Sequence, residues 1–162
     1  MKTKGLSRPA LYILTLSDKK IQMPELYIDQ DLKNLLIQTR TIAIIGARDK
    51  PGRPVDTVGR YLMDAGYRVV PVHPKRQNIW GLETWQSIMD IPFPVDIINL
   101  FRAADYCPDH AREVLRLSYT PMCFWMQLGI SSSKAADILC SKPVMIVQDR
   151  CIKIEHQRLI GA

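Results

Sequence analysis

The sequence predicts an α/β fold of the Rossmann-like type, in which helices cover both faces of a five-stranded parallel sheet. Short apolar segments alternate five times with segments of helical character, and the connections between them are short. Such alternation favours parallel strands joined by right-handed crossovers. In addition, residues 41–60 place an apolar segment, a loop rich in Arg, Lys, Pro and Gly and the start of a helix in the order that nucleotide-binding domains use. We therefore expect a three-layer αβα domain with the strand order 3-2-1-4-5.

Five apolar runs predict the strands. The first, TIAII, leads directly into Gly46, and the second, YRVVPV, follows Gly66. Their nearly continuous apolar character is typical of parallel strands that helices cover on both faces. The strands are expected at residues 41–45, 67–72, 95–100, 122–128 and 144–147.

Periodicity and helix-end signals predict the helices. Leu32, Leu35 and Leu36 recur at the spacing of one helix face in the first of them. Gly66 is a typical C-cap for the second helix, and Ser132 or the serine before it is a typical N-cap for the last. The helices are expected at residues 29–39, 55–65, 83–90, 105–117 and 131–140, and the segment after residue 148 is expected to end in a short helix or an additional strand.

The net charge of +6 is concentrated at the N-terminus. Residues 1–22 carry five Lys or Arg against one Asp, so they account for four of these charges. We expect them to form a basic, flexible tail and residues 23–162 to form a single domain of ordinary size. Because the domain itself has little excess charge, the composition disfavours nucleic-acid binding. No apolar run approaches the ~20 residues that span a bilayer, so we expect no membrane partner either.

Four cysteines and three histidines are scattered along the sequence. They form no CxxC pair and no HxxxH spacing, so the sequence predicts no metal site. Unpaired thiols in a domain of this size are typical of a reducing cytoplasm, which is where we expect the protein to work.

The loop after the first strand is the first candidate binding element. Gly46 permits a sharp turn, and the helix N-terminus that follows favours an anion. Arg48, Lys50 and Arg53 add three cations, and Pro54 helps to stiffen the loop. The three glycine positions of a GxGxxG dinucleotide fingerprint, however, hold Gly, Arg and Pro. The loop therefore indicates a phosphorylated ligand that is not bound through the standard fingerprint.

The turn after the second strand is basic. It reads Val72, His73, Pro74, Lys75 and Arg76, where NAD-binding domains present an acidic side chain to the ribose 2′-hydroxyl. We interpret the histidine as a hydrogen-bonding element of the turn rather than a general base. A basic turn suits a phosphate on the ribose, and both NADP and coenzyme A carry one in addition to a pyrophosphate. The residues alone leave these two ligands open.

The third and fourth strands deliver further candidates. Phe101 and Arg102 follow the third strand, where the phenyl ring can flank an adenine or pack against the neighbouring helix. Met126 and Gln127 close the fourth strand, and the Gln amide is a candidate polar group for the ligand. His110 lies on the intervening helix and is expected to be solvated.

Five strings together resemble the CoA-binding domain family, the Rossmann-like module also found at the N-terminus of succinyl-CoA synthetase α subunits. The strings are IAIIGARDKPGRP, GYRVVPVHP, VDIINLFR, FWMQLGI and DRCIKIEHQRL, of which the last is the most specific. The resemblance covers roughly residues 29–159 and is strongest to the small stand-alone bacterial members. The phosphohistidine of the synthetase belongs to a second domain that this sequence lacks, so the resemblance implies the ligand and not the ligase activity.

The resemblance implies that coenzyme A or an acyl-CoA is the ligand. It implies that the Gly46 loop contacts the CoA phosphates and that the turn after the second strand lines the adenosine-phosphate side. It also implies that the ends of the third and fourth strands lie near the pantetheine arm or the adenine. The candidate ligand-binding residues are therefore Gly46, Ala47, Arg48, Lys50, Arg53, Pro54, Val72, His73, Pro74, Lys75, Arg76, Phe101, Arg102, Met126 and Gln127.

The sequence contains no convincing catalytic constellation. Cys151 and His156 could supply a thiolate and a base, but they are five residues apart and do not clearly face one another, and a buried free cysteine is ordinary. We expect a binding domain without activity of its own, and its protein partner and oligomeric state stay open. One alternative is an NADP-dependent oxidoreductase or redox sensor, which the basic turn supports and the missing fingerprint disfavours. Another is an interaction module with a vestigial pocket, which the basic loops disfavour.

Overall fold

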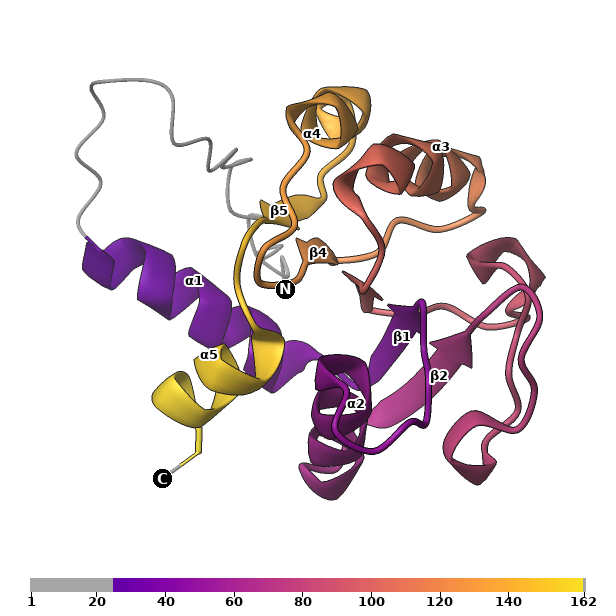
Figure 1. The fold of residues 1–162 in the computed structure, drawn as a ribbon. Coiled ribbons are helices and arrows are strands. Elements are labelled where there is room, and N and C mark those ends of the chain that lie inside the picture. The colour runs from indigo at the N-terminus through magenta and orange to yellow at the C-terminus, as the bar shows by residue number, and fades with distance from the viewer. Residues whose placement is uncertain (1–24, 162) are drawn as a thin grey trace, which may run out of the picture.

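The sheet is wholly parallel and consists of five strands. The computed structural model describes residues 25–161, and in this part of the chain the strands lie in the order β2-β1-β3-β4-β5 (Figure 1). Almost every strand residue is buried, as expected for a parallel sheet with helices on both faces. The strands are β1 (Thr41–Ile45), β2 (Arg68–Val72), β3 (Ile97–Leu100), β4 (Cys123–Met126) and β5 (Met145–Val147).

Local signals account for where several helices begin. The ring of Pro54 pre-sets the backbone for the first turn of its helix. The hydroxyl oxygen of Ser132 accepts a hydrogen bond from the N–H of Ala135 (3.1 Å) and so caps another. The α-helices are α1 (Glu25–Gln38), α2 (Pro54–Asp64), α3 (Cys107–Arg116), α4 (Ser133–Leu139) and α5 (Ile152–Leu159), and the 3-10 helices are η1 (Ile79–Gly81), η2 (Ile88–Asp90) and η3 (Ala104–Tyr106).

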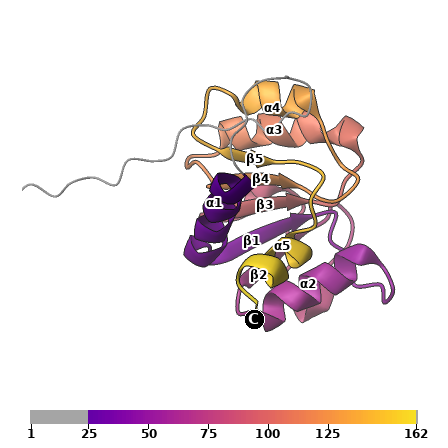
Figure 2. The same cartoon turned by 90° about the vertical axis from the view of Figure 1, so that its left-hand side faces the viewer.

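Each face of the sheet carries its own apolar core. Successive strand residues point to opposite faces. Ile42 and Ile44 of β1 therefore pack with α1, α2 and α5, whereas Ala43 and Ile45 pack with α3, α4 and η2. Figure 2 shows α1 and α5 crossing in front of the strands. The result is the expected three-layer arrangement.

The predicted fold class is confirmed, including the five parallel strands and the Rossmann-like layering. The observed order differs from the predicted 3-2-1-4-5 in the place of β3, which lies between β1 and β4 and not outside β2. Both orders can be built from right-handed crossovers, so the alternation of strands and helices does not choose between them. In the observed order the chain reverses its direction of travel across the sheet between β1 and β3, as in flavodoxin-like folds, and ligands of such sheets bind at that point.

The connection from β2 to β3 contains two single-turn 3-10 helices, so the α-helix predicted at residues 83–90 was wrong. Trp85 instead continues the sheet beside β2, opposite Val72. Its N–H donates to the carbonyl oxygen of Pro71 (3.0 Å), and its carbonyl oxygen accepts from the N–H of His73 (2.9 Å). Because this pairing requires extended backbone, it excludes a helix at that position.

The C-terminal segment forms a helix, α5, which packs against α1. The guanidinium of Arg158 donates two hydrogen bonds of 2.6 Å to the carboxylate of Asp29 and one of 2.6 Å to that of Glu155. The hydrogen bonds from Arg158 hold the pKa of Asp29 below its ordinary value. The basic tail predicted at residues 1–22 lies outside the described residues.

Candidate functional site

The loops that follow β1 and β3 meet at the carboxyl edge of the sheet. Gly46 has a φ of +80°, in the left-handed region. A Cβ built on it would clash with the carbonyl oxygen of Phe101. Glycine therefore meets a conformational and a steric requirement at once. The contact lies at the reversal point of the sheet, where a ligand is expected.

The loop after β1 is also joined to the end of β2. The N–H groups of Gly46 and Ala47 both donate to the carbonyl oxygen of Val72, at 3.0 and 3.3 Å. These two N–H groups are thus used within the fold. An anion at this loop would depend on the later part of the loop and on its side chains, among which Lys50 and Arg53 are exposed.

Positive charges from three loops act on His73. Its Nδ1 accepts hydrogen bonds from the N–H groups of Lys75 and Arg76, each at 3.0 Å, so the imidazole fixes the shape of the basic turn. Burial lowers the pKa of His73, and the charges of Arg76, Arg48, Arg102 and Lys75 lower it further. A charge shifts a pKa in this way when it is close by, so the loops after β1, β2 and β3 share one positively charged edge.

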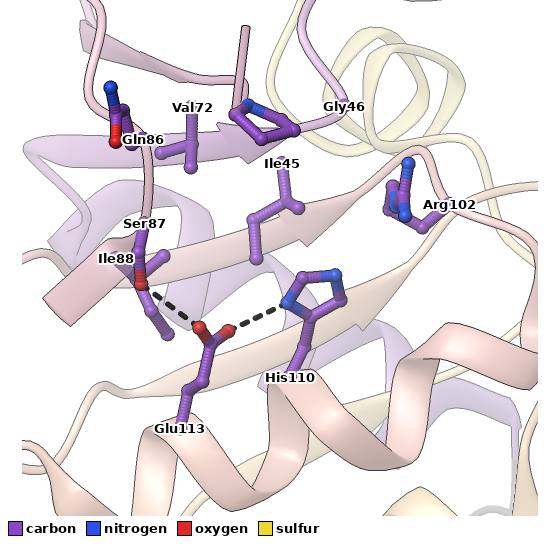
Figure 3. Close-up of a pocket in the computed structure, with 10 residues that line it drawn as sticks. Ile45, Gly46, Val72, Gln86, Ser87, Ile88, Arg102, His110 and Glu113 are labelled. Atoms are coloured by element: carbon purple, nitrogen blue, oxygen red, sulfur yellow. Dashed lines mark hydrogen bonds and ion pairs between the residues drawn. The ribbon is translucent and has the colours of Figure 1, made fainter.

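A cavity of about 110 Å³ opens beside this edge, on the face of the sheet that α3 covers (Figure 3). Its apolar part comes from the ends of β1 and β2 and from η2. Its polar part comes from the loop after β3, from α3 and from the residues just before η2. The cavity is lined by Ile45, Gly46, Val72, Pro74, Gln86, Ser87, Ile88, Arg102, His110 and Glu113.

Three of the polar lining residues form a hydrogen-bonded group. The carboxylate of Glu113 accepts a hydrogen bond from the hydroxyl of Ser87 (2.9 Å) and is bound to Nδ1 of His110 (2.7 Å), as the dashed lines in Figure 3 show. Burial alone would raise the pKa of Glu113. The hydrogen bonds from His110 and Ser87 outweigh that effect and leave the pKa below its ordinary value. The side chain is therefore a carboxylate at neutral pH.

The structure brings most of the predicted loop residues to one edge. Gly46, Val72, Pro74 and Arg102 line the cavity, while Arg48, Lys75 and Arg76 gather with His73 beside it. Ala47 is buried beneath the loop, and Lys50, Arg53 and Pro54 lie exposed at its far end, where α2 begins.

The predicted residues at the ends of β3 and β4 are less accessible. Phe101 is half-buried and packs in the core on the α1 face. Met126 is fully buried under α3 and α4. Gln127 is 2% exposed, and its Nε2 donates to Oδ1 of Asn99 at 2.7 Å, so its amide is engaged inside the protein.

Sequence reasoning missed the Ser87–Glu113–His110 group. His110 was expected to be solvated, yet its side chain is 19% exposed and faces the cavity. The spacing of His110 and Glu113, three residues apart on a predicted helix, was a usable signal, because such residues share one helix face. The participation of Ser87 could not be predicted from the sequence, since it depends on how the connection from β2 to β3 folds back onto α3.

The C-terminal segment offers no arrangement that resembles a nucleophile and its base. Cys151 is half-buried at the start of α5, whereas Nδ1 of His156 is bound to the hydroxyl of Tyr61 at 2.7 Å. Within residues 25–161, no three His, Cys, Asp or Glu side chains lie close enough to hold a metal ion. The described helices are also all too short or too polar to cross a membrane.

Comparison with known proteins gives a consistent result. Residues 40–157 match a family model described as a CoA binding domain. An uncharacterized protein of Bacillus subtilis, YneT, is 33% identical over 126 residues, which are 78% of this chain and 92% of that protein. A solved Thermus thermophilus structure, cell-free ID.343, is 41% identical with a TM-score of 0.76, over 82% of this chain and 98% of the other.

A more distant match concerns part of a larger enzyme. The ADP-forming acetate–CoA ligase of Methanocaldococcus jannaschii is 28% identical over 69 residues, which are 43% of this chain and 10% of the ligase. The similarity thus spans a small fraction of that enzyme.

Proposed function

The chain belongs to the family of CoA binding domains, and on this premise we propose that it binds coenzyme A or an acyl-CoA at the carboxyl edge of its sheet, without catalysing a reaction by itself. The observation that carries the proposal is that the charges of Arg48, Arg76 and Arg102, which come from three different loops, all act on His73. CoA carries a pyrophosphate and a separate ribose phosphate, so it needs cations from more than one loop. A charge-assisted hydrogen bond to each phosphate contributes about 1.5–3 kcal/mol.

The proposed contacts follow from where the loops lie. The loop from Gly46 to Pro54 receives the pyrophosphate, and Arg48 is the cation of this loop whose charge acts on His73 beside the cavity. The basic turn receives the ribose phosphate, because Lys75 and Arg76 are exposed there and their backbone is fixed by His73. The pantetheine arm then extends toward the ends of β3 and β4.

A non-catalytic role is supported by the arrangement of the reactive side chains. The Ser87 hydroxyl donates its hydrogen bond to the Glu113 carboxylate and not to an imidazole. The pKa of that carboxyl group is lowered, so it is only a weak base for activating the hydroxyl. We propose that ligand occupancy is reported to a partner protein in the cytoplasm, where the four free cysteines would stay reduced.

The second candidate function is NADP binding by an oxidoreductase or redox sensor. The observation that favours it is the basic turn after β2, because Lys75 and Arg76 could equally face the 2′-phosphate of NADP. The missing GxGxxG fingerprint and the family membership both disfavour it.

Calorimetric titration of the purified, reduced protein with CoA, acetyl-CoA, NADP and NAD tests the proposal. We expect a dissociation constant for CoA of about 1 μM and no binding of NAD. Arg76→Glu should weaken CoA binding by about 10- to 100-fold, because it removes one phosphate contact and adds a repulsive charge. The matched control is Lys142→Glu, which makes the same charge change in the loop before β5. That strand and β2 are the two outer strands of the sheet. Binding of NADP without binding of CoA would overturn the proposal.

A further inference from the structure

The interior of the cavity differs in charge from its edge. The edge carries the cations around His73, whereas the interior holds the carboxylate of Glu113 above apolar side chains that include Ile45, Val72 and Ile88. A partly buried carboxylate repels a phosphate, since little solvent screens the two charges. The Glu113 carboxylate therefore disfavours a phosphate in the interior, where the apolar side chains suit a part of the ligand that has an apolar face.

Glu113 also fixes the hydrogen-bonding character of His110. An uncharged imidazole has one N–H and one acceptor nitrogen. In the uncharged ring that donates from Nδ1 to the Glu113 carboxylate (2.7 Å), Nε2 is the acceptor. Figure 3 shows that this second nitrogen points away from Glu113, to the side of the cavity where Arg102 lies. Within the described residues no hydrogen bond to Nε2 is present.

We propose that this cavity binds the purine base of the nucleotide ligand and that Nε2 of His110 accepts a hydrogen bond from the exocyclic amine of that base. The inference rests on the proposed function and names a subsite within it. The flat base would lie on Val72 and Ile45, and its amine would reach the imidazole. Glu113 and Ser87 act as positioning residues, because they hold the ring in the required orientation and need not touch the ligand.

The covalent structure of CoA favours the base over the pantetheine arm in this cavity. The cavity and the basic turn share Val72 and Pro74, so the two are directly adjacent. The base is attached to the same ribose that carries the extra phosphate. The arm, in contrast, lies beyond the pyrophosphate. A ligand whose ribose phosphate faces Lys75 and Arg76 therefore brings its base, and not its arm, to His110.

The test compares CoA with deamino-CoA, in which an oxygen replaces the exocyclic amine. Wild-type protein should bind CoA about tenfold more tightly, the factor expected for one buried hydrogen bond. In His110→Leu the ratio of the two dissociation constants should fall to about 1. His110→Gln is the matched variant, because its amide oxygen can occupy the place of Nε2, and it should keep a preference for CoA. Glu113→Gln should give an intermediate ratio, since the ring loses the carboxylate that orients it.

A control separates this ratio from affinity in general. Arg48→Ala should weaken the binding of both ligands by a similar factor and leave the ratio near its wild-type value. A wild-type ratio of about 1, or a ratio that His110→Leu does not change, would overturn the inference while CoA binding still supported the proposed function. Absence of CoA binding to the wild-type protein would overturn both. Thermal unfolding of each variant establishes whether it is folded. If His110→Leu is not folded, the comparison of His110→Gln with the wild-type protein still tests the inference.

Discussion

Gly46 and Phe101 approach each other so closely that no side chain fits between them. A Cβ on Gly46 would overlap the carbonyl oxygen of Phe101, and Phe101 cannot easily move away, because its N–H donates to the carbonyl oxygen of Ile45 at 2.9 Å. The two nearest atoms belong to the backbone of Phe101, so a rotamer change does not relieve the overlap. The contact joins the loops after β1 and β3, from which much of the candidate site is built.

Gly46→Ala should therefore be strongly destabilising. The left-handed φ of +80° costs about 1–2 kcal/mol for an L-residue. The overlap with the backbone adds to it, so we expect a loss of about 3 kcal/mol or more in the free energy of unfolding. Urea titration followed by circular dichroism measures this loss.

Gly52 provides a matched control in the same loop. Its φ is +81°, but a Cβ built on it meets no atom within 4 Å. Gly52→Ala should cost about 1–2 kcal/mol, from the backbone conformation alone. Equal losses for the two variants would contradict the steric role of the contact between Gly46 and Phe101.

The fold class could be predicted from the sequence, but the position of one strand and one helix could not. The strands are short apolar runs and the helices have clear ends, so local patterns were sufficient for the fold class. The place of β3 was not predictable, because it depends on which edge of the growing sheet the crossover reaches. The helix predicted at residues 83–90 failed for a related reason: Trp85 gains backbone hydrogen bonds to β2 that no local pattern reveals.

The candidate site was likewise only partly predictable from the sequence. The basic loops were predictable, since the carboxyl ends of parallel strands bring their loops to one edge, and the cations of Arg48 and Arg76 do meet there. The cavity was not, because Ser87 and Glu113 lie 26 residues apart and meet through the irregular connection from β2 to β3. Gln127 shows the converse case, a polar residue at a strand end whose amide is bound inside the protein.

Gly59 and Trp80 are coupled, and their coupling can be measured. A Cβ on Gly59 would clash with the indole ring of Trp80, whose Nε1 donates to Oδ1 of Asp56 at 2.8 Å. Gly59→Ala should destabilise the wild-type protein by about 1–3 kcal/mol, because the ring is displaced from its place on α2. In a Trp80→Leu background the same substitution should stabilise by about 0.5–1 kcal/mol, the ordinary gain for Gly to Ala within a helix.

Unfolding free energies of the four proteins in this cycle give the coupling directly. A destabilising effect of Gly59→Ala that is equal in both backgrounds would refute the packing of Trp80 against Gly59.

The stability of the protein should decrease as the pH falls below about 6.5. Burial lowers the pKa of His156 from its ordinary value of 6.5, and its Nδ1 is engaged with the hydroxyl of Tyr61. The unfolded chain therefore takes up a proton at a higher pH than the folded one. The folded state loses stability from about pH 6.5 down to the folded pKa, below which the loss is complete. His73, whose pKa is also lowered, acts in the same direction.

Urea midpoints at about pH 7.5 and about pH 5.5 measure this dependence. The difference between the two midpoints should be smaller in His156→Gln than in the wild-type protein, although the variant is less stable at both values. An unchanged difference would exclude His156 as a source of the pH dependence and leave it to His73 and the carboxylates.

Asn99 and Gln127 form a buried polar pair whose two members depend on each other. Asn99 is fully buried, its Oδ1 accepts from Gln127 at 2.7 Å, and its Nδ2 has no hydrogen-bond partner among the described residues. Asn99→Leu or Gln127→Leu alone should cost about 1–3 kcal/mol, because each leaves the remaining amide buried without its partner. The double substitution removes both amides, so it should cost less than the sum of the single ones and approach the cost of one. Urea titration of the three variants tests this coupling, and strictly additive losses would show that the two amides do not depend on each other.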